Sequence, residues 1–230
     1  MNRDRNTRPS AFSRLELLAL VGAVLLLAAA VLPAIAGNRI RSDRVLCANN
    51  LRQIGKALEL WGNDHGDQPP WEILPADGGT YQHPLALNVW YHLAWMSNEL
   101  VTPKILLCPT DTGQPARDFT GDPTGGYVHP NFANRATSYF LNHPFSFLPN
   151  EMLAGDRNIT SLFISSCPRF GSALQNYGYP STALRWTTAL HNNAGNLLVC
   201  DGRVEQFATP QLPRGVASAE SGALHFITPR

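Results

Sequence analysis

The sequence LLALVGAVLLLAAAVLPAIA at residues 17–36 contains 20 consecutive residues without a charge. As an α-helix rising about 1.5 Å per residue, it would be about 30 Å long, which matches the hydrocarbon core of a bilayer. The apolar core of a cleavable signal peptide is shorter, at about 7–15 residues. The stretch therefore predicts a membrane-spanning helix near the N-terminus, and a plain signal anchor is its simplest interpretation.

The composition of the chain argues against a nucleic-acid partner. Its 230 residues include 18 Lys and Arg and 17 Asp and Glu, a formal net charge of +1, whereas an electrostatic nucleic-acid binder presents a strongly basic surface. Hydrophobic residues make up 44% of the chain, which excludes a disordered protein. The 18 Gly and 18 Pro indicate that much of the fold consists of turns and ordered loops.

An acidic residue, Glu16, stands at the edge of the apolar run, in the sequence Phe12-Ser13-Arg14-Leu15-Glu16. A carboxylate in this position is costly in lipid, and by default it indicates a function. The segment resembles the processing site of type IV prepilins and type II secretion pseudopilins. The resemblance implies that a prepilin peptidase cuts between Ala11 and Phe12, that Phe12 becomes N-methylated, and that Glu16 pairs with the α-amine of a neighbouring Phe12 during assembly.

A second helical pattern follows the apolar run. Apolar side chains recur at helical spacing and define one face of an amphipathic helix. These side chains are Ile40, Cys47, Leu51, Ile54, Leu58 and Trp61. The turn-forming residues 62–66 end the helix, and Pro69-Pro70 prevents it from restarting. The processing-site resemblance implies a leader at residues 1–11. The two helical patterns predict a transmembrane helix at 12–37 and an amphipathic helix at 38–63, and a tether followed by an unrelated helix is the alternative.

The sequence Cys47-Ala48-Asn49-Asn50-Leu51-Arg52-Gln53-Ile54-Gly55 resembles the C-x-N-N-L-[KR]-Q-I-G stretch of a pilin-like group abundant in planctomycete-type bacteria. That group carries a C-terminal element in which a His is followed by nine residues and an Asp-Gly pair. In this chain His191 precedes Asp201-Gly202 at that spacing. Asp-Gly is also the strongest two-residue hairpin signal and predicts a type I′ turn, so residues 191–207 are expected to form a β-hairpin.

The rest of the chain has the pattern of short strands and loops. Strands are expected at residues 105–107, 138–141, 159–165, 186–190, 197–200 and 203–207, and a short helix at residues 85–96. The expected fold class is α+β, with a long N-terminal helix, half transmembrane and half amphipathic, packed on an antiparallel sheet. We expect a loop-rich, pilin-like head at residues 64–209 and a C-terminal tail at residues 210–230.

The four cysteines are Cys47, Cys108, Cys167 and Cys200. An even number in an exported domain favours disulfides, and four cysteines allow three pairings. We favour Cys47 with Cys108 and Cys167 with Cys200, and reduced, buried thiols are the alternative. Because no C-x-x-C spacing occurs, no zinc site is expected.

Few residues suggest a chemical reaction, and we expect that the protein is not an enzyme. A hydrolase that uses His191 with Asp201 is the enzymatic alternative, although in a hairpin Asp201 would serve the turn. Asp156 is expected to pair with Arg157 or to cap a turn. No cofactor is expected; calcium is the one candidate ion, but its oxygen donors lack EF-hand spacing. Those donors are Asp64 and Asp67, or Asp111, Asp118 and Asp122.

The resemblance implies a structural subunit of a type II secretion or type IV pilus-type assembly. Its partners would be the membrane, prepilin peptidase and other pilin-like subunits. It would be a single-pass protein of the cytoplasmic (inner) membrane with an extracytoplasmic head. The alternative is a membrane-tethered domain that binds a polysaccharide or a protein and does not polymerise.

Overall fold

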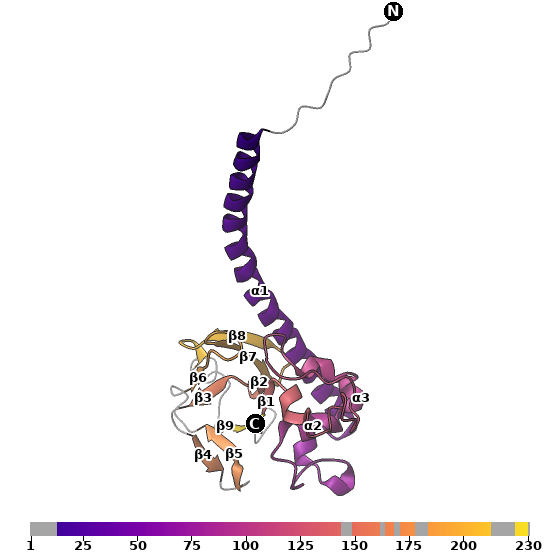
Figure 1. The fold of residues 1–230 in the computed structure, drawn as a ribbon. Coiled ribbons are helices and arrows are strands. Elements are labelled where there is room, and N and C mark those ends of the chain that lie inside the picture. The colour runs from indigo at the N-terminus through magenta and orange to yellow at the C-terminus, as the bar shows by residue number, and fades with distance from the viewer. Residues whose placement is uncertain are drawn as a thin grey trace, which may run out of the picture. The chain divides into compact units, whose positions relative to one another are not determined.

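The computed structural model describes residues 13–143, 149–161, 164–167, 171–177, 184–212 and 224–229 (Figure 1). The expected processing site, Ala11 and Phe12, lies outside the described residues. Contacts divide the chain into two compact units, Met1–Ser42 and Asp43–Arg230. The second unit is a mixed α+β domain, as the sequence predicts at that level of detail.

A single 51-residue helix, α1 (Arg14–Asp64), runs from the first unit into the second. In the second unit its apolar face is buried, as the spacing predicts, and the buried members of that face are Cys47, Leu51, Ile54, Leu58 and Trp61. The helix ends as expected at the glycine-rich turn. Gly66 and Asp67 adopt positive φ, and the Asp67 amide donates to the Gly62 carbonyl at 2.8 Å.

Short helices connect α1 to the sheet. They are the 3₁₀ turns η1 (Pro70–Glu72), η2 (Pro75–Asp77), η3 (Pro103–Leu106) and η4 (Ala133–Ala136), and the α-helices α2 (Val89–Trp95) and α3 (Ser97–Leu100). The expected helix at residues 85–96 is confirmed in shorter form as α2. The expected strand at 105–107 is wrong, because Pro103 and the Thr102 side chain, which accepts from the Lys104 amide, start the η3 turn there.

The head contains a seven-stranded sheet with the order β4-β5-β9-β1-β2-β7-β8, and every neighbouring pair is antiparallel. Its strands are β1 (Tyr139–Asn142), β2 (Met152–Asp156), β4 (Ile164–Cys167), β5 (Gly171–Tyr177), β7 (Ala194–Val199), β8 (Val204–Ala208) and β9 (Leu224–Ile227). A separate two-stranded sheet pairs β3 (Ile159–Ser161) with β6 (Leu184–Trp186). The expected strand at residues 159–165 is therefore divided between two sheets.

The two faces of the large sheet bury different side chains. Leu141, Leu198 and Ile227 pack in one cluster with the apolar face of α1 and with α2. Their neighbours Phe140, Leu197 and Phe226 pack in a second cluster with the β3–β6 sheet. Because successive strand residues point to opposite faces, the helices cover one face and the small sheet covers the other.

The β7–β8 hairpin is present, but its loop has three residues rather than the expected two. The Val199 amide donates to the Arg203 carbonyl at 3.0 Å, and the Gly202 amide donates to the Val199 carbonyl at 2.9 Å. A type I′ turn needs positive φ at both central residues; of Asp201 and Gly202, only Gly202 has it, at 84°. The loop therefore matches the three-residue class, in which a left-handed glycine forms a bulge.

The segment expected to be a C-terminal tail contributes a strand to the sheet. Strand β9 lies between β1 and β5, where Leu141 pairs with Ile227 and Gln175 pairs with Phe226. The head therefore extends past residue 209, and its boundary at that residue is corrected.

Candidate functional site: the Cys47–Cys108 cluster and the apolar helix

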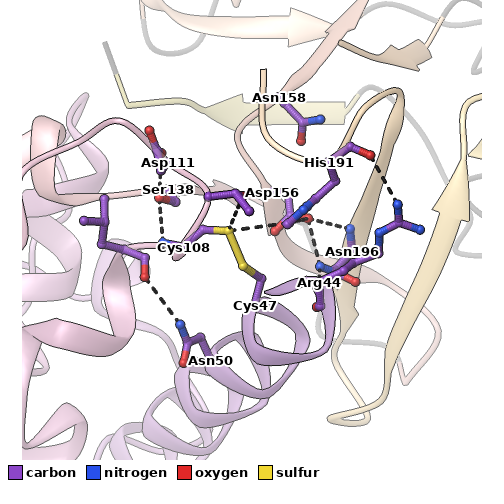
Figure 2. Close-up of a disulfide and its surroundings, with 12 residues drawn as sticks. Arg44, Cys47, Asn50, Cys108, Asp111, Ser138, Asp156, Asn158, His191 and Asn196 are labelled. Atoms are coloured by element: carbon purple, nitrogen blue, oxygen red, sulfur yellow. Dashed lines mark hydrogen bonds and ion pairs between the residues drawn. A yellow bond between two sulfur atoms is a disulfide. The ribbon is translucent and has the colours of Figure 1, made fainter. Parts of the chain in front are cut away.

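A disulfide joins Cys47 on α1 to Cys108, which follows η3 (Figure 2). Both residues are fully buried, and the bond closes a sequence separation of 61 residues. It fastens the helix to the segment that leads into β1. The expected pairing of these two cysteines is confirmed.

The second expected pairing, Cys167 with Cys200, is wrong, because Cys200 has a free thiol. Cys167 belongs to β4 and Cys200 follows β7, and four strands separate β4 from β7 in the sheet. At about 4.8 Å per strand step, this order places the two strands about 24 Å apart. A disulfide requires Cα atoms within about 7 Å. Burial raises the pKa of the Cys200 thiol to about 12, so this thiol is protonated at neutral pH.

His191 lies beside the disulfide and faces Asp156 at the end of β2. Its Nε2 is 3.5 Å from Cys108 Sγ and 3.4 Å from Asp156 Oδ2. Asn196 on β7 donates to that same carboxylate oxygen twice, from its backbone amide at 2.8 Å and from Nδ2 at 2.9 Å. Figure 2 shows these side chains together around the sulfur atoms. All three residues are buried.

The enzymatic alternative pairs His191 with Asp201 rather than with Asp156. Asp201 is exposed at the tip of the β7–β8 hairpin, where its carboxylate contacts the Arg203 guanidinium and accepts from the Arg203 amide. The structure therefore brings His191 to Asp156, and it gives Asp201 the turn role that the hairpin interpretation predicts.

The spacing between His191 and the Asp-Gly pair has a structural explanation. Asn192 and Asn193 both adopt positive φ, at 51° and 62°, a conformation that Asn tolerates better than most residues. They turn the chain into β7, whose six residues occupy positions 194–199, and Cys200 opens the hairpin loop. The nine residues therefore comprise a two-residue turn, one strand and one loop residue, and this arrangement places both His191 and Asn196 at the carboxylate.

The electrostatics of the cluster follow from burial. Burial raises the pKa of Asp156 to about 7, against the two Asn196 hydrogen bonds and the Arg44 charge, which lower it. Burial and the Arg44 charge lower the pKa of His191 to about 4, against the charge of Asp43, which raises it. Arg44 also donates to the His191 carbonyl at 3.2 Å. At neutral pH His191 is therefore an uncharged imidazole.

A second polar group supports Cys108 from the other side. The Cys108 amide donates to Ser138 Oγ at 2.8 Å, and this hydroxyl donates to Asp111 Oδ2 at 2.6 Å. Arg157 donates to both Asp111 oxygens, from Nε at 2.7 Å and from Nη2 at 2.6 Å. Although burial opposes the shift, the bonds from Arg157 and Ser138 lower the pKa of Asp111. Arg157 thus pairs with Asp111, and the expected pair with Asp156 is wrong.

Of the carboxylates considered for calcium, three accept hydrogen bonds from protein groups and two lie at the end of α1 and in the turn after it. Asp111 is held by Arg157, as described above. Asp118 and Asp122 each accept hydrogen bonds from a threonine two residues later, at 2.6–3.0 Å. Asp64 ends α1, and Asp67 is exposed in the turn that follows.

The first part of α1 exposes a continuous apolar surface. Residues 14–31 form a helical segment that is long and apolar enough to cross a membrane. None of this segment is buried against the described part of the chain. Leu15, Leu18 and Leu26 are each more than 70% exposed. In water such a surface is strongly unfavourable, so it needs lipid or other protein surface to cover it.

Glu16 has a local role at the start of α1. Its carboxylate accepts from the Ser13 amide at 2.8 Å and from Ser13 Oγ at 3.0 Å, while the Glu16 amide donates to Ser13 Oγ at 3.3 Å. These reciprocal bonds form a capping box. The S-x-x-E pattern of Ser13 and Glu16 is the sequence signal for this cap.

A groove of about 590 Å³ lies between the last turns of α1 and the β7–β8 loop. Its lining includes Lys56, Glu59, Asp67, Cys200 and Asp201. The lining combines charged side chains of both signs with Cys200, which carries a free thiol.

Comparison of the chain with protein families, with curated proteins and with solved structures found no match.

Proposed function

We propose that the chain is a membrane-anchored, pilin-like structural subunit of a type II secretion or type IV pilus-type assembly. A prepilin peptidase removes residues 1–11, and Phe12 becomes the mature N-terminus. The apolar half of α1 then holds the protein in the cytoplasmic membrane and packs against other subunits when they assemble. The α+β head is extracytoplasmic and catalyses no reaction.

The observation that carries this proposal is the contrast between the two halves of α1. Residues 17–31 are uncharged and exposed, whereas the later residues of the same helix bury one face in the head. A helix with this division supports a lipid-embedded segment that continues into the helix of a folded domain. The buried disulfide supports an oxidising, extracytoplasmic location for the head.

Two variants separate the assembly role of Glu16 from its capping role. Glu16→Gln keeps a side chain that completes a capping box but removes the charge that would pair with a neighbouring α-amine. Ser13→Ala removes the cap and keeps the carboxylate. Cross-linking in native membranes is expected to yield oligomers of the wild type and of Ser13→Ala, and only monomers of Glu16→Gln.

The opposite result has a clear meaning. If Glu16→Gln forms the same oligomers as the wild type, charge pairing is not the role of Glu16, and the capping box accounts for the residue. Membrane fractionation of both variants is the control, because each must remain membrane-bound for the comparison to hold.

The second candidate function is a membrane-tethered binding domain that does not polymerise. The groove between α1 and the β7–β8 loop favours it, since its charged lining suits a polar ligand such as a polysaccharide or a protein segment. This function predicts a monomer in cross-linking experiments, with or without Glu16.

A further inference from the structure

Three metal-ligating atoms converge at the buried disulfide. The sulfur atoms of Cys47 and Cys108 and a ring nitrogen of His191 all lie within 4.8 Å of one another, and this is the one such His, Cys, Asp or Glu group found among the described residues. Asp156 is the nearest further donor, because its Oδ2 lies 3.4 Å from His191 Nε2. It is not among the atoms that lie within 4.8 Å of one another, so its side chain would have to turn toward the sulfur atoms to complete a four-ligand site. All four residues are buried.

The distances around His191 fit tetrahedral zinc. In tetrahedral sites Zn–S bonds are about 2.3 Å long, and Zn–N and Zn–O bonds are about 2.0–2.1 Å long. These lengths place a nitrogen ligand about 3.5 Å from a sulfur ligand and about 3.3 Å from an oxygen ligand. The observed separations are 3.5 Å from His191 Nε2 to Cys108 Sγ and 3.4 Å from it to Asp156 Oδ2. The covalent S–S bond prevents both sulfurs from binding an ion, so disulfide and metal exclude each other.

The charges in the cluster also fit a zinc ion. Two thiolates and the Asp156 carboxylate would carry three negative charges, one more than Zn²⁺ balances. The Arg44 guanidinium, which donates to the His191 carbonyl at 3.2 Å, offsets that remaining charge. His191 would bind the ion as a neutral imidazole, which is the form that binds metals. Asp156 Oδ1 is buried without a hydrogen-bond partner in the described structure.

We propose that this chain binds one Zn²⁺ through Cys47, Cys108, His191 and Asp156 when the Cys47–Cys108 disulfide is reduced. The absence of a C-x-x-C spacing in the sequence argues against a zinc site of adjacent cysteines. Here the ligands come from α1, the segment after η3, the end of β2 and the turn before β7, and only the fold brings them together. The disulfide and the ion are then two alternative ways to fasten α1 to the sheet.

The exchange between the two states is a two-electron reaction. An external dithiol reduces the S–S bond, which breaks to give two cysteine thiols, while the dithiol closes to its own disulfide. Binding of Zn²⁺ then releases the two thiol protons to solvent. Since both cysteines are fully buried, reduction requires an opened chain, and the choice between metal and disulfide is made during folding.

The test uses the full chain in detergent. The protein is reduced with a phosphine in guanidinium, refolded with ZnCl₂, and separated from free metal before zinc and free thiols are counted. We expect one zinc per reduced chain, none per oxidised chain, and protection of two thiols from alkylation. Refolding is monitored by the near-ultraviolet circular dichroism of the buried Trp71 and Trp186.

Variants identify the ligands. His191→Ala and the double variant Cys47→Ser/Cys108→Ser are expected to lose the zinc, and Asp156→Asn is expected to weaken binding at least about tenfold. Cys200→Ser is the matched control, because it removes the free thiol and should keep one zinc. Binding that is unchanged in His191→Ala, or lost in Cys200→Ser, overturns the proposal.

A measurement on the wild type covers the case in which His191→Ala does not fold. Reduced protein loaded with Co²⁺ is expected to show the intense visible bands of a tetrahedral ion with thiolate charge transfer. A refolded, reduced wild type that binds no metal, or that gives the weak spectrum of an octahedral ion, also overturns the proposal.

Discussion

Asn196 donates both its backbone amide and its side-chain amide to one oxygen of Asp156, at 2.8 and 2.9 Å. The side chains of Asp156 and His191, which lie 3.4 Å apart, are fully buried. The segment from His191 to Asp201 therefore contributes to a polar cluster in the interior of the head. The Asp-Gly pair that ends this segment lies at the surface of the head.

Asn196→Ala is expected to destabilise the head by about 1.5–3 kcal/mol, because it removes a hydrogen bond to a buried carboxylate. Urea unfolding of the full chain in detergent measures this change. Gln206→Ala is the matched control, since Gln206 lies directly opposite Asn196 in the β7–β8 register and is exposed. Equal stabilities for the two variants would contradict the role assigned to the Asp156 cluster.

The stability of the wild type is expected to change little with pH between about 4 and 6.5, because two titrations oppose each other there. The folded pKa of Asp156 is raised from 3.8 to about 7, so its contribution is complete below pH 4 and is lost as the pH rises to 7. The folded pKa of His191 is lowered from 6.5 to about 4, so its contribution is complete above pH 6.5 and is lost as the pH falls to 4.

Single variants should reveal these opposing slopes. The stability of Asp156→Asn is expected to rise with pH over this range, because only the His191 term remains. The stability of His191→Asn is expected to fall over the same range. Urea midpoints measured at several pH values give both slopes, and slopes of the same sign in the two variants would refute the assignment.

Gly195→Ala is expected to destabilise the head by about 1–3 kcal/mol, because overpacking displaces neighbouring groups. A Cβ at this position would lie 2.7 Å from the Trp186 indole ring, which packs against the β7 backbone. Gly121→Ala is the control, since its Cβ would meet nothing within 4 Å. Thermal unfolding of the two variants tests the prediction, and a Gly195→Ala protein as stable as the control would contradict the packing described.

Loss of the Cys47–Cys108 bond is expected to cost about 4 kcal/mol by the chain-entropy relation for a separation of 61 residues. The double variant Cys47→Ser/Cys108→Ser, unfolded without zinc, measures this cost. Cys200→Ser should change stability by less than about 1 kcal/mol, because Cys200 is only partly buried and makes no disulfide. A double variant as stable as Cys200→Ser would show that the bond contributes nothing.

The sequence predicts the structure most completely where a periodic or local pattern determines it. The buried face of α1 and its end near Gly62 follow from helical spacing and local turn chemistry. Ser13 with Glu16 was also predictable, since a capping box is a local motif.

The rest depends on contacts between distant segments. Strand β9 has only four residues, and its place between β1 and β5 follows from long-range pairing that a short apolar segment does not reveal. The contact between His191 and Asp156 requires the register of β2 against β7, whereas the sequence suggests the nearer Asp201. Arg157 likewise reaches Asp111 across 46 residues rather than its neighbour.

The most direct test of the central claim is the intact mass and N-terminal sequence of the protein isolated from membranes. The proposed function predicts a mature chain that begins at Phe12 and carries one additional methyl group. A chain that still begins at Met1, or that has been cut after Ala36, would contradict processing by a prepilin peptidase and leave an ordinary anchor or a secreted domain.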